Sequence, residues 1–357
     1  MTFKKFVERG TKGLNEGIKT GIETFDKSFF GILPSSMYII CGGSGVGKST
    51  LTDSNFFLYP YFTTDKNVKF IYFSFELSEI KKKIKWLNYI IAKEEGITIP
   101  EEVIGGYGDR KLTTYELELI DRYLPKVEKI FEDIDFYADP INPTGIRAIL
   151  YEYAEKNGKF VFDKSKPYKD ANGKTQYPHE KWIPNDPNQR TVIIIDHIAL
   201  ATEEKGATTE KAIIDKIAVY MRWFRNMCGF TPILIQQFNN ALQSINRDPR
   251  SQEYYTPQQV DMGGSSYTFR EAEIVIGGIN PGVFDIKKYH KYQILDVYDV
   301  KGNLKIKGLG RGASFWFIMK NRDFGNHPVA KLYRGDVPMM QELPSPKANG
   351  TVFTWQT

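Results

Sequence analysis

A glycine-rich stretch within the first fifty residues has the spacing of a loop that binds phosphate groups: Gly42-Gly43-Ser44-Gly45-Val46-Gly47-Lys48-Ser49-Thr50. It satisfies the pattern G-x-x-x-x-G-K-[ST] and follows an apolar run, Met37–Cys41, that is expected to form a strand. Glycines let successive backbone N–H groups converge on phosphate oxygens, and the next helix N-terminus favours their negative charge. Lys48 is expected to reach the β- and γ-phosphates of ATP, and Ser49 to ligate Mg²⁺. The alternative, a glycine-rich turn without a ligand, does not explain the preceding strand.

A single carboxylate, Glu76, comes directly after another apolar run, Val68–Phe75. In a sheet that carries a phosphate loop, a Glu at the end of a strand can face the γ-phosphate. It would then polarise the attacking water as a general base. The alternative is a surface Glu that starts the next helix or only complements its dipole. These residues by themselves leave both interpretations open.

Asp196 closes the run Val192–Ile195, and its position fits a carboxylate that holds Mg²⁺ through water. A helix cap is the alternative interpretation of Asp196. It agrees less well with the apolar residues 197–200 that follow, because a capped helix usually begins with a polar turn.

Two later strands also end in polar residues. Gln236 and Gln237 follow the run Ile233–Ile235, and an amide there can sense the γ-phosphate through a hydrogen bond, although either Gln can equally be exposed. Lys320 and Arg322 follow a C-terminal apolar run. A cationic pair at a strand end is usually solvated, but an arginine finger has the same appearance in sequence. Composition does not choose between these two interpretations.

The elements that must position these residues follow an alternating pattern of short apolar runs and segments with helical periodicity. This pattern predicts an α/β fold with a mostly parallel central sheet flanked by helices, followed by C-terminal strands. Strands are expected at Met37–Cys41, Val68–Ser74, Val192–Ile195, Ile233–Ile235, Ile274–Ile276 and Phe315–Met319. Helices are expected at Glu79–Glu95 and Lys211–Met227.

Composition excludes several classes of protein. The chain has 357 residues and a net charge of +5, with 41% hydrophobic and 25% charged residues, which is typical of a soluble globular protein. No apolar run approaches the ~18–20 residues of a membrane-spanning helix, and the N-terminus lacks the apolar segment of a signal peptide, so we expect a cytoplasmic protein without a membrane partner. Cys41 and Cys228 are expected to be buried thiols. The four histidines share no metal-binding spacing.

The expected domain organisation is one large domain with short flanking segments. Residues 1–16 are interpreted as a linker segment, 17–343 as the α/β domain and 344–357 as a C-terminal tail. Within the domain, the polar residues 156–190 are interpreted as a surface insertion.

The order of these features resembles the RecA-like ATPase domain of DnaB-type replicative helicases, the hexameric superfamily-four group of bacteria and their phages. Five blocks carry the resemblance, over about residues 17–340: TGIETFD with GILP (20–26, 31–34), the P-loop, FELS (75–78), QQFN (236–239) and KNR (320–322). The segments DMGGSS (261–266) and REAEIV (270–275) are similar to a further block of the family. The chain departs from the family at Asn240, where the family has Arg.

The resemblance assigns roles to individual residues. It implies that Glu76 is the catalytic base, that Asp196 is the Walker B carboxylate and that Gln237, rather than Gln236, senses the phosphate. It also implies that Lys320 and Arg322 reach the γ-phosphate bound by a neighbouring subunit, which requires a ring or filament. The expected oligomer is a homo-oligomeric ring, with a hexamer as the family's form.

The same resemblance directs attention to loops that would face single-stranded DNA. We expect DNA contacts from Arg247, Arg250, Gly264 and Ser265, with phosphate contacts from the arginines and stacking from nearby tyrosines. The alternative is an ordinary polar loop, because only two arginines stand against nearby acidic residues.

The function predicted from the sequence is an ATP-dependent DNA helicase or translocase motor that acts in replication, with ATP and Mg²⁺ as cofactors and a primase or loader as a further partner. If the chain is phage-encoded, it is expected in the host cytoplasm. Two alternatives stay open: a RecA-, RadA- or KaiC-like ATPase without unwinding activity, and a nucleotide-binding structural protein. ATP turnover that rises with DNA would distinguish a helicase from the first alternative. Any ATP hydrolysis would distinguish it from the second.

Overall fold

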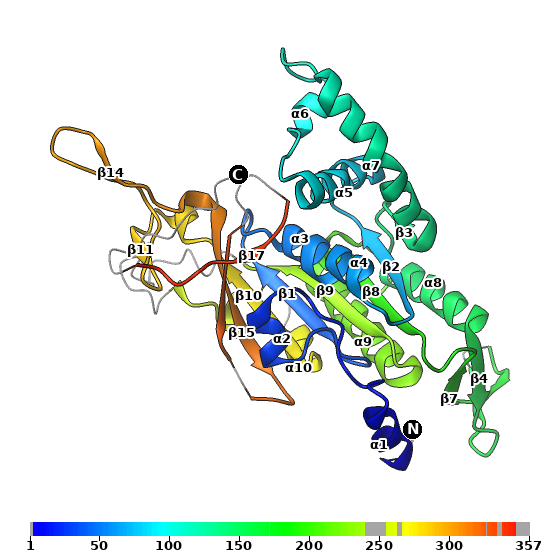
Figure 1. The fold of residues 1–357 in the computed structure, drawn as a ribbon. Helices are drawn as coiled ribbons and strands as arrows, with labels where there is room; N and C mark the ends of the chain where they lie inside the picture. Colours follow the sequence, from blue (N-terminus) through cyan, green and yellow to red (C-terminus); the bar gives the residue numbers. More distant parts are fainter. Residues whose placement is uncertain are drawn as a thin grey trace.

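The computed structural model describes residues 3–170, 172–239, 255–262, 266–325, 327–333 and 338–347. Its centre is a nine-stranded sheet with the strand order β17-β16-β15-β10-β1-β9-β8-β2-β3 (Figure 1). The six strands from β10 to β3 are parallel, and the three at the other end are antiparallel. The α/β fold class predicted from the sequence is therefore confirmed.

The strands of this sheet are β1 Tyr38–Gly42, β2 Val68–Ser74, β3 Asp135–Tyr137, β8 Arg190–Asp196, β9 Thr231–Gln237, β10 Ile274–Ile279, β15 Ala313–Asn321, β16 Val329–Tyr333 and β17 Gln341–Glu342. The helices are α1 Phe3–Thr11, α2 Glu23–Ser28, α3 Lys48–Leu51, α4 Tyr59–Thr63, α5 Glu79–Glu95, α6 Glu101–Ile104, α7 Thr114–Asp133, α8 Pro143–Lys156, α9 Glu210–Cys228 and α10 Ser266–Glu271. A π-helical segment, Thr52–Leu58, joins α3 to α4. All six expected strands and both expected helices are present.

Helices cover both faces of the sheet, and this explains why the central strands are apolar throughout. Alternate residues of a strand point to opposite faces, so a strand that is buried on both sides has no polar face. On β1, Ile40 belongs to the hydrophobic cluster under the π-helical segment, α5 and α7, whereas Ile39 belongs to the cluster under α8 and α9. The carboxyl ends of the parallel strands meet at one edge of the sheet, where the site lies.

Two hairpin regions extend from the domain at opposite ends of the molecule (Figure 1). Residues 158–184, within the expected insertion, form an antiparallel pair, β4 Gly158–Phe162 with β7 His179–Pro184, and a smaller pair, β5 Tyr168–Lys169 with β6 Thr175–Gln176. Residues 285–311 follow β10 and contain β11 Lys288–Tyr289, β12 Tyr292–Gln293, β13 Val297–Tyr298 and β14 Leu304–Ile306. We call residues 285–311 the basic arm.

The N-terminal helix α1 has no buried residue, and its apolar side chains Phe3, Phe6 and Val7 are 82%, 50% and 47% exposed. In the described part of the chain, no helix is long and apolar enough to cross a membrane. Both cysteines are free and buried, as expected. No group of histidine, cysteine and acidic side chains among the described residues has the arrangement of a metal-binding cluster.

Candidate active site

Four strand ends bring the predicted site residues to one edge of the sheet. Gly42, at the end of β1, lies opposite Gln237 at the end of β9, and Ser74 of β2 lies opposite Asp196 of β8. Glu76 follows β2 by two residues. The structure thus places the phosphate loop, Gln237, Asp196 and Glu76 on neighbouring strands.

The loop between β1 and α3 has the backbone conformation that its glycines allow. Gly45 and Gly47 have φ angles of 74° and 92°, in the left-handed region that side chains disfavour. A Cβ on Gly42 would lie 2.6 Å from Val46 Cγ1 and 3.0 Å from the carbonyl oxygen of Gly278, so a side chain there would force its neighbours to shift. The Lys48 ammonium donates a hydrogen bond of 3.0 Å to the carbonyl of Gly43, across the loop. Burial lowers the pKa of Lys48, although the negative charges of Asp196 and Glu76 act in the opposite direction and raise it.

The side-chain oxygens of Ser49 and Asp196 lie together beside the phosphate loop. The Ser49 hydroxyl donates to Asp196 Oδ1 at 3.1 Å, and the Asp196 side chain is fully buried. A hydroxyl and a carboxylate are ligands that Mg²⁺ accepts, with water and phosphate oxygens completing its coordination. The donor set therefore fits the metal that the sequence predicts.

Glu76 is exposed, unlike the strand that precedes it. The Phe75 amide donates to the Asp196 carbonyl at 2.8 Å, and the Ser74 hydroxyl donates to the Leu77 carbonyl at 2.7 Å. These two bonds fix the backbone on both sides of Glu76 beside the Asp196 strand. An exposed carboxylate at this position can reach water, as a general base must.

The two glutamines at the end of β9 differ in their surroundings. Gln236 is buried, and its amide oxygen accepts a 2.8 Å hydrogen bond from the Thr268 hydroxyl of α10. Gln237 is exposed at the edge where the phosphate loop lies. This difference favours Gln237 as the residue that meets a phosphate.

Lys320 and Arg322 lie at the opposite edge of the sheet, because β15 runs antiparallel to β10 and Asn321 pairs with the first residue of β10. The four residue steps from Tyr38 to Gly42 along β1 span about 13 Å at ~3.3 Å per residue. Neither cation is therefore at this chain's own phosphate loop. If either acts on a γ-phosphate, it acts on one that another subunit binds.

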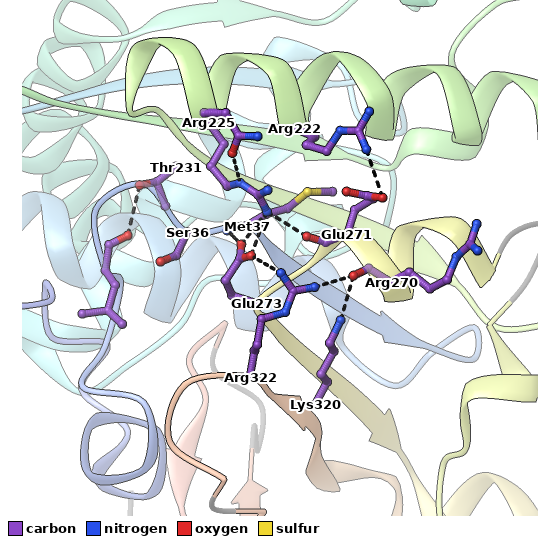
Figure 2. Close-up of polar contacts among 12 residues, drawn as sticks. Ser36, Met37, Arg222, Arg225, Thr231, Arg270, Glu271, Glu273, Lys320 and Arg322 are labelled. Atoms are coloured by element: carbon purple, nitrogen blue, oxygen red, sulfur yellow. Dashed lines mark hydrogen bonds and ion pairs between the residues drawn. The ribbon is translucent and has the colours of Figure 1, made fainter. Parts of the chain in front are cut away.

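Figure 2 shows how these two cations are held. Lys320 donates to the carbonyls of Phe269 and Arg270 at 2.7 and 2.9 Å, and Arg322 donates to the same Arg270 carbonyl and to Glu273 Oε1 at 2.5 and 2.9 Å. Glu273 also binds Arg225 and the amide of Met37. Both cations thus cap the C-terminal end of α10, where carbonyl groups favour positive charge.

The predicted DNA-contacting residues Arg247, Arg250, Gly264 and Ser265 lie outside the described residues. Tyr255, at the end of that segment, is buried against Phe284, with ring centroids 5.2 Å apart.

A buried charged network behind Asp196 was not predicted from the sequence. Lys82 of α5 is fully buried and forms ion pairs with Asp53 at 2.9 Å and with Asp196 at 3.2 Å. Its ammonium also donates to the Tyr72 hydroxyl at 2.8 Å. Burial opposes the charged form of Lys82, but the two carboxylates outweigh that effect and raise its pKa. The signal in the sequence was a lysine four residues before Trp86 on the apolar side of α5, where an aliphatic residue is expected.

Comparison with solved structures shows the fold of the chain. The ATPase domain of a phage helicase matches 96% of this chain and 97% of its own length, with a TM-score of 0.66 and 12% sequence identity. A DnaB-like replicative helicase, described with its interactions with primase, matches 96% of this chain and 68% of its own, with a TM-score of 0.64 and 12% identity. No protein-family model and no curated protein matches the sequence. The chain has a RecA-like ATPase-domain fold, as the sequence resemblance predicted.

Proposed function

We propose that this chain is the ATPase motor of a DnaB-like helicase, which hydrolyses ATP between subunits of a homo-oligomeric ring and moves on single-stranded DNA during replication. The observation that carries the proposal is the division of the catalytic set between two edges of one sheet. Lys48, Ser49 and Asp196 lie at the phosphate-loop edge with Glu76, whereas Arg322 lies at the far edge. A complete set then requires two chains, and a closed ring completes every site.

In this mechanism Glu76 accepts the proton of the water whose oxygen attacks the γ-phosphorus. The bond to the β-phosphate oxygen breaks, and its electron pair leaves with ADP. Lys48 would hold the phosphate oxygens, and Ser49 and Asp196 would hold Mg²⁺, which when bound would supply neutralisation of the charge on those oxygens. Gln237, exposed beside the phosphate loop, would report the loss of the γ-phosphate to the rest of β9.

Helix α1 offers a surface for contact between subunits. Its exposed Phe3, Phe6 and Val7 lie within two turns of one helix, and three large apolar side chains of this kind seldom remain in water. We infer that α1 packs against a second copy of the chain. A primase or a loader is a further candidate partner, since the DnaB-like neighbour was described with primase.

The test is steady-state ATP hydrolysis by the purified chain, with and without a single-stranded oligonucleotide, over a range of protein concentrations. Turnover that rises with DNA and more than linearly with protein concentration supports a DNA-coupled ring. Turnover that ignores DNA supports a RecA- or KaiC-like ATPase with another partner. Nucleotide binding without hydrolysis under all conditions supports a structural protein.

We infer that the basic arm contacts a nucleic-acid backbone. It carries seven Lys and Arg residues against three Asp, all ten exposed, so this short segment holds a net charge of +4. Asp296 and Asp299 accept hydrogen bonds from the arm's own backbone, at Gly308, Lys301 and Asn303. None of the seven cations forms an ion pair with another described residue. The arm follows the carboxyl end of β10, at the phosphate-loop edge of the sheet.

Replacing Lys301, Lys305 and Lys307 together by Gln is expected to weaken single-stranded DNA binding and its salt dependence. Each lost phosphate contact lowers the slope of log K against log salt by about 0.7, so the slope should fall by about 2. Fluorescence anisotropy of a labelled oligonucleotide at several salt concentrations measures this slope. The matched control replaces Lys164, Lys174 and Lys181 of the opposite hairpin region by Gln, which removes equal charge. Equal slopes in the two triple variants would exclude the arm as a DNA contact.

A further inference from the structure

We propose that Lys82 is a positioning residue for the metal site: its buried ammonium binds one oxygen of Asp196 and thereby presents the other oxygen to Ser49 and Mg²⁺. The inference rests on the proposed function, because it assigns Asp196 to the metal. It adds three buried residues, Lys82, Asp53 and Tyr72, that would act through Asp196.

Every hydrogen-bonding group of the Lys82 ammonium has a partner. Its three protons are shared among Asp53, Asp196 and the Tyr72 hydroxyl, at 2.9, 3.2 and 2.8 Å. The Tyr72 hydroxyl in turn donates to Asp53 Oδ1 at 2.6 Å. A lysine has three donors, so these three partners use all of them. The Lys82 ammonium is therefore held in one position, which is necessary if it is to orient the Asp196 carboxylate.

The two oxygens of Asp196 are consequently divided between two roles. Oδ2 accepts from Lys82, and Oδ1 accepts from the Ser49 hydroxyl, on the side of the phosphate loop. A carboxylate bound at one oxygen cannot rotate freely, and the orientation of a metal ligand is commonly set by such an outer partner. Lys82 thus leaves Oδ1 as the oxygen that faces the metal.

Asp53 is the second carboxylate that Lys82 contacts, besides Asp196. Asp53 comes one helical turn after Ser49, and the network therefore ties the phosphate-loop helix to α5, β2 and β8. Four elements that meet at the site are fixed by a single ammonium group.

Removing Lys82 alone is a poor test, because two buried carboxylates would lose their partner and the fold would be destabilised. The better variant makes the network apolar: Asp53→Leu, Tyr72→Phe and Lys82→Met together. Replacement of a buried ion pair by apolar residues of similar size is often neutral for stability. The change that remains at the site is the lost donor to Asp196 Oδ2.

The measurement is metal binding to the complex of the chain with ADP, followed by loss of the free Mn²⁺ signal in electron paramagnetic resonance. Loss of an outer partner typically weakens metal affinity by about 10–100-fold, and we expect at least a tenfold loss in the triple variant. ADP binding in EDTA should stay close to that of the unchanged chain, whereas the thermal unfolding midpoint should fall, because the buried Asp196 loses the cation with which it pairs. Lys83→Met, which removes the neighbouring, partly exposed lysine of α5, is the control and should leave Mn²⁺ affinity unchanged.

Unchanged Mn²⁺ affinity in a folded triple variant overturns the inference while the proposed function stands. If the unchanged chain binds no Mn²⁺ with ADP, the proposed function fails first. Should the triple variant not fold, Asp53→Asn with Lys82→Met keeps the Tyr72 hydroxyl partnered. The same weakening of Mn²⁺ binding is then expected, and unchanged Mn²⁺ affinity in this double variant would likewise overturn the inference.

Discussion

Replacing Arg322 by Ala is expected to lower ATP turnover by about 10³–10⁵-fold, the contribution of an arginine finger that stabilises charge in the transition state. The loss should appear in kcat, with nucleotide affinity nearly unchanged, because Arg322 lies at the sheet edge opposite its own phosphate loop. Steady-state hydrolysis and equilibrium binding of a fluorescent ATP analogue measure the two quantities. Arg222→Ala is the matched control, since Arg222 is similarly exposed and pairs with Glu271 in the same network (Figure 2).

A mixing experiment distinguishes action on a neighbour from a general loss of structure. Arg322→Ala chains retain Glu76, and Glu76→Gln chains retain Arg322. In a ring mixed at random in equal amounts, about one quarter of the interfaces combine both intact residues. The mixture should therefore recover up to about one quarter of normal turnover although each variant alone is nearly inactive. No recovery on mixing, with both variants assembled, would contradict a finger that acts between subunits.

Replacing Glu76 by Gln is expected to lower kcat by about 10²–10⁴-fold, the usual contribution of a general base. The amide keeps the size of the carboxylate but cannot accept the proton of the attacking water. Binding of Mg²⁺ and ATP should persist, because Lys48, Ser49 and Asp196 are unchanged. Single-turnover hydrolysis measures the chemical step directly.

Glu79→Gln is the control for Glu76, since Glu79 lies three residues later at the start of α5 and pairs with Lys83 on the surface. It should change turnover by less than about twofold, because an exposed ion pair contributes little. Equal losses in the two variants would mean that charge near α5, and not the identity of Glu76, limits turnover.

The parallel part of the sheet and the carboxyl edge where the candidate site residues meet were predictable from the sequence. Strands buried on both faces are apolar along their whole length, and the polar residue that ends each one marks the carboxyl edge. Helix α5 begins and ends at the residues expected from its periodicity, Glu79 and Glu95, because Gly96 in the left-handed conformation terminates it.

Other features needed three-dimensional contacts. Strand β17 and the arm strands β11 to β13 contain two residues each, which is too short for an alternating pattern. The Lys82 network joins residues 53, 72, 82 and 196, which only the fold brings together. Periodicity places position 82 on the apolar side of α5 with Trp86, but a lysine within a helix is ordinarily assigned to the solvent face, so the residue type conceals its burial.

Helix α10 has only six residues, yet it is joined to the strand that ends in Gln237 through Thr268 and to Lys320 and Arg322 through its last carbonyls. In the proposed ring, these bonds connect the strand that would meet the phosphate to the cations that would act on a neighbouring subunit. A glycine placed within α10 is therefore expected to weaken the coupling between neighbouring subunits without altering any group that would touch ATP.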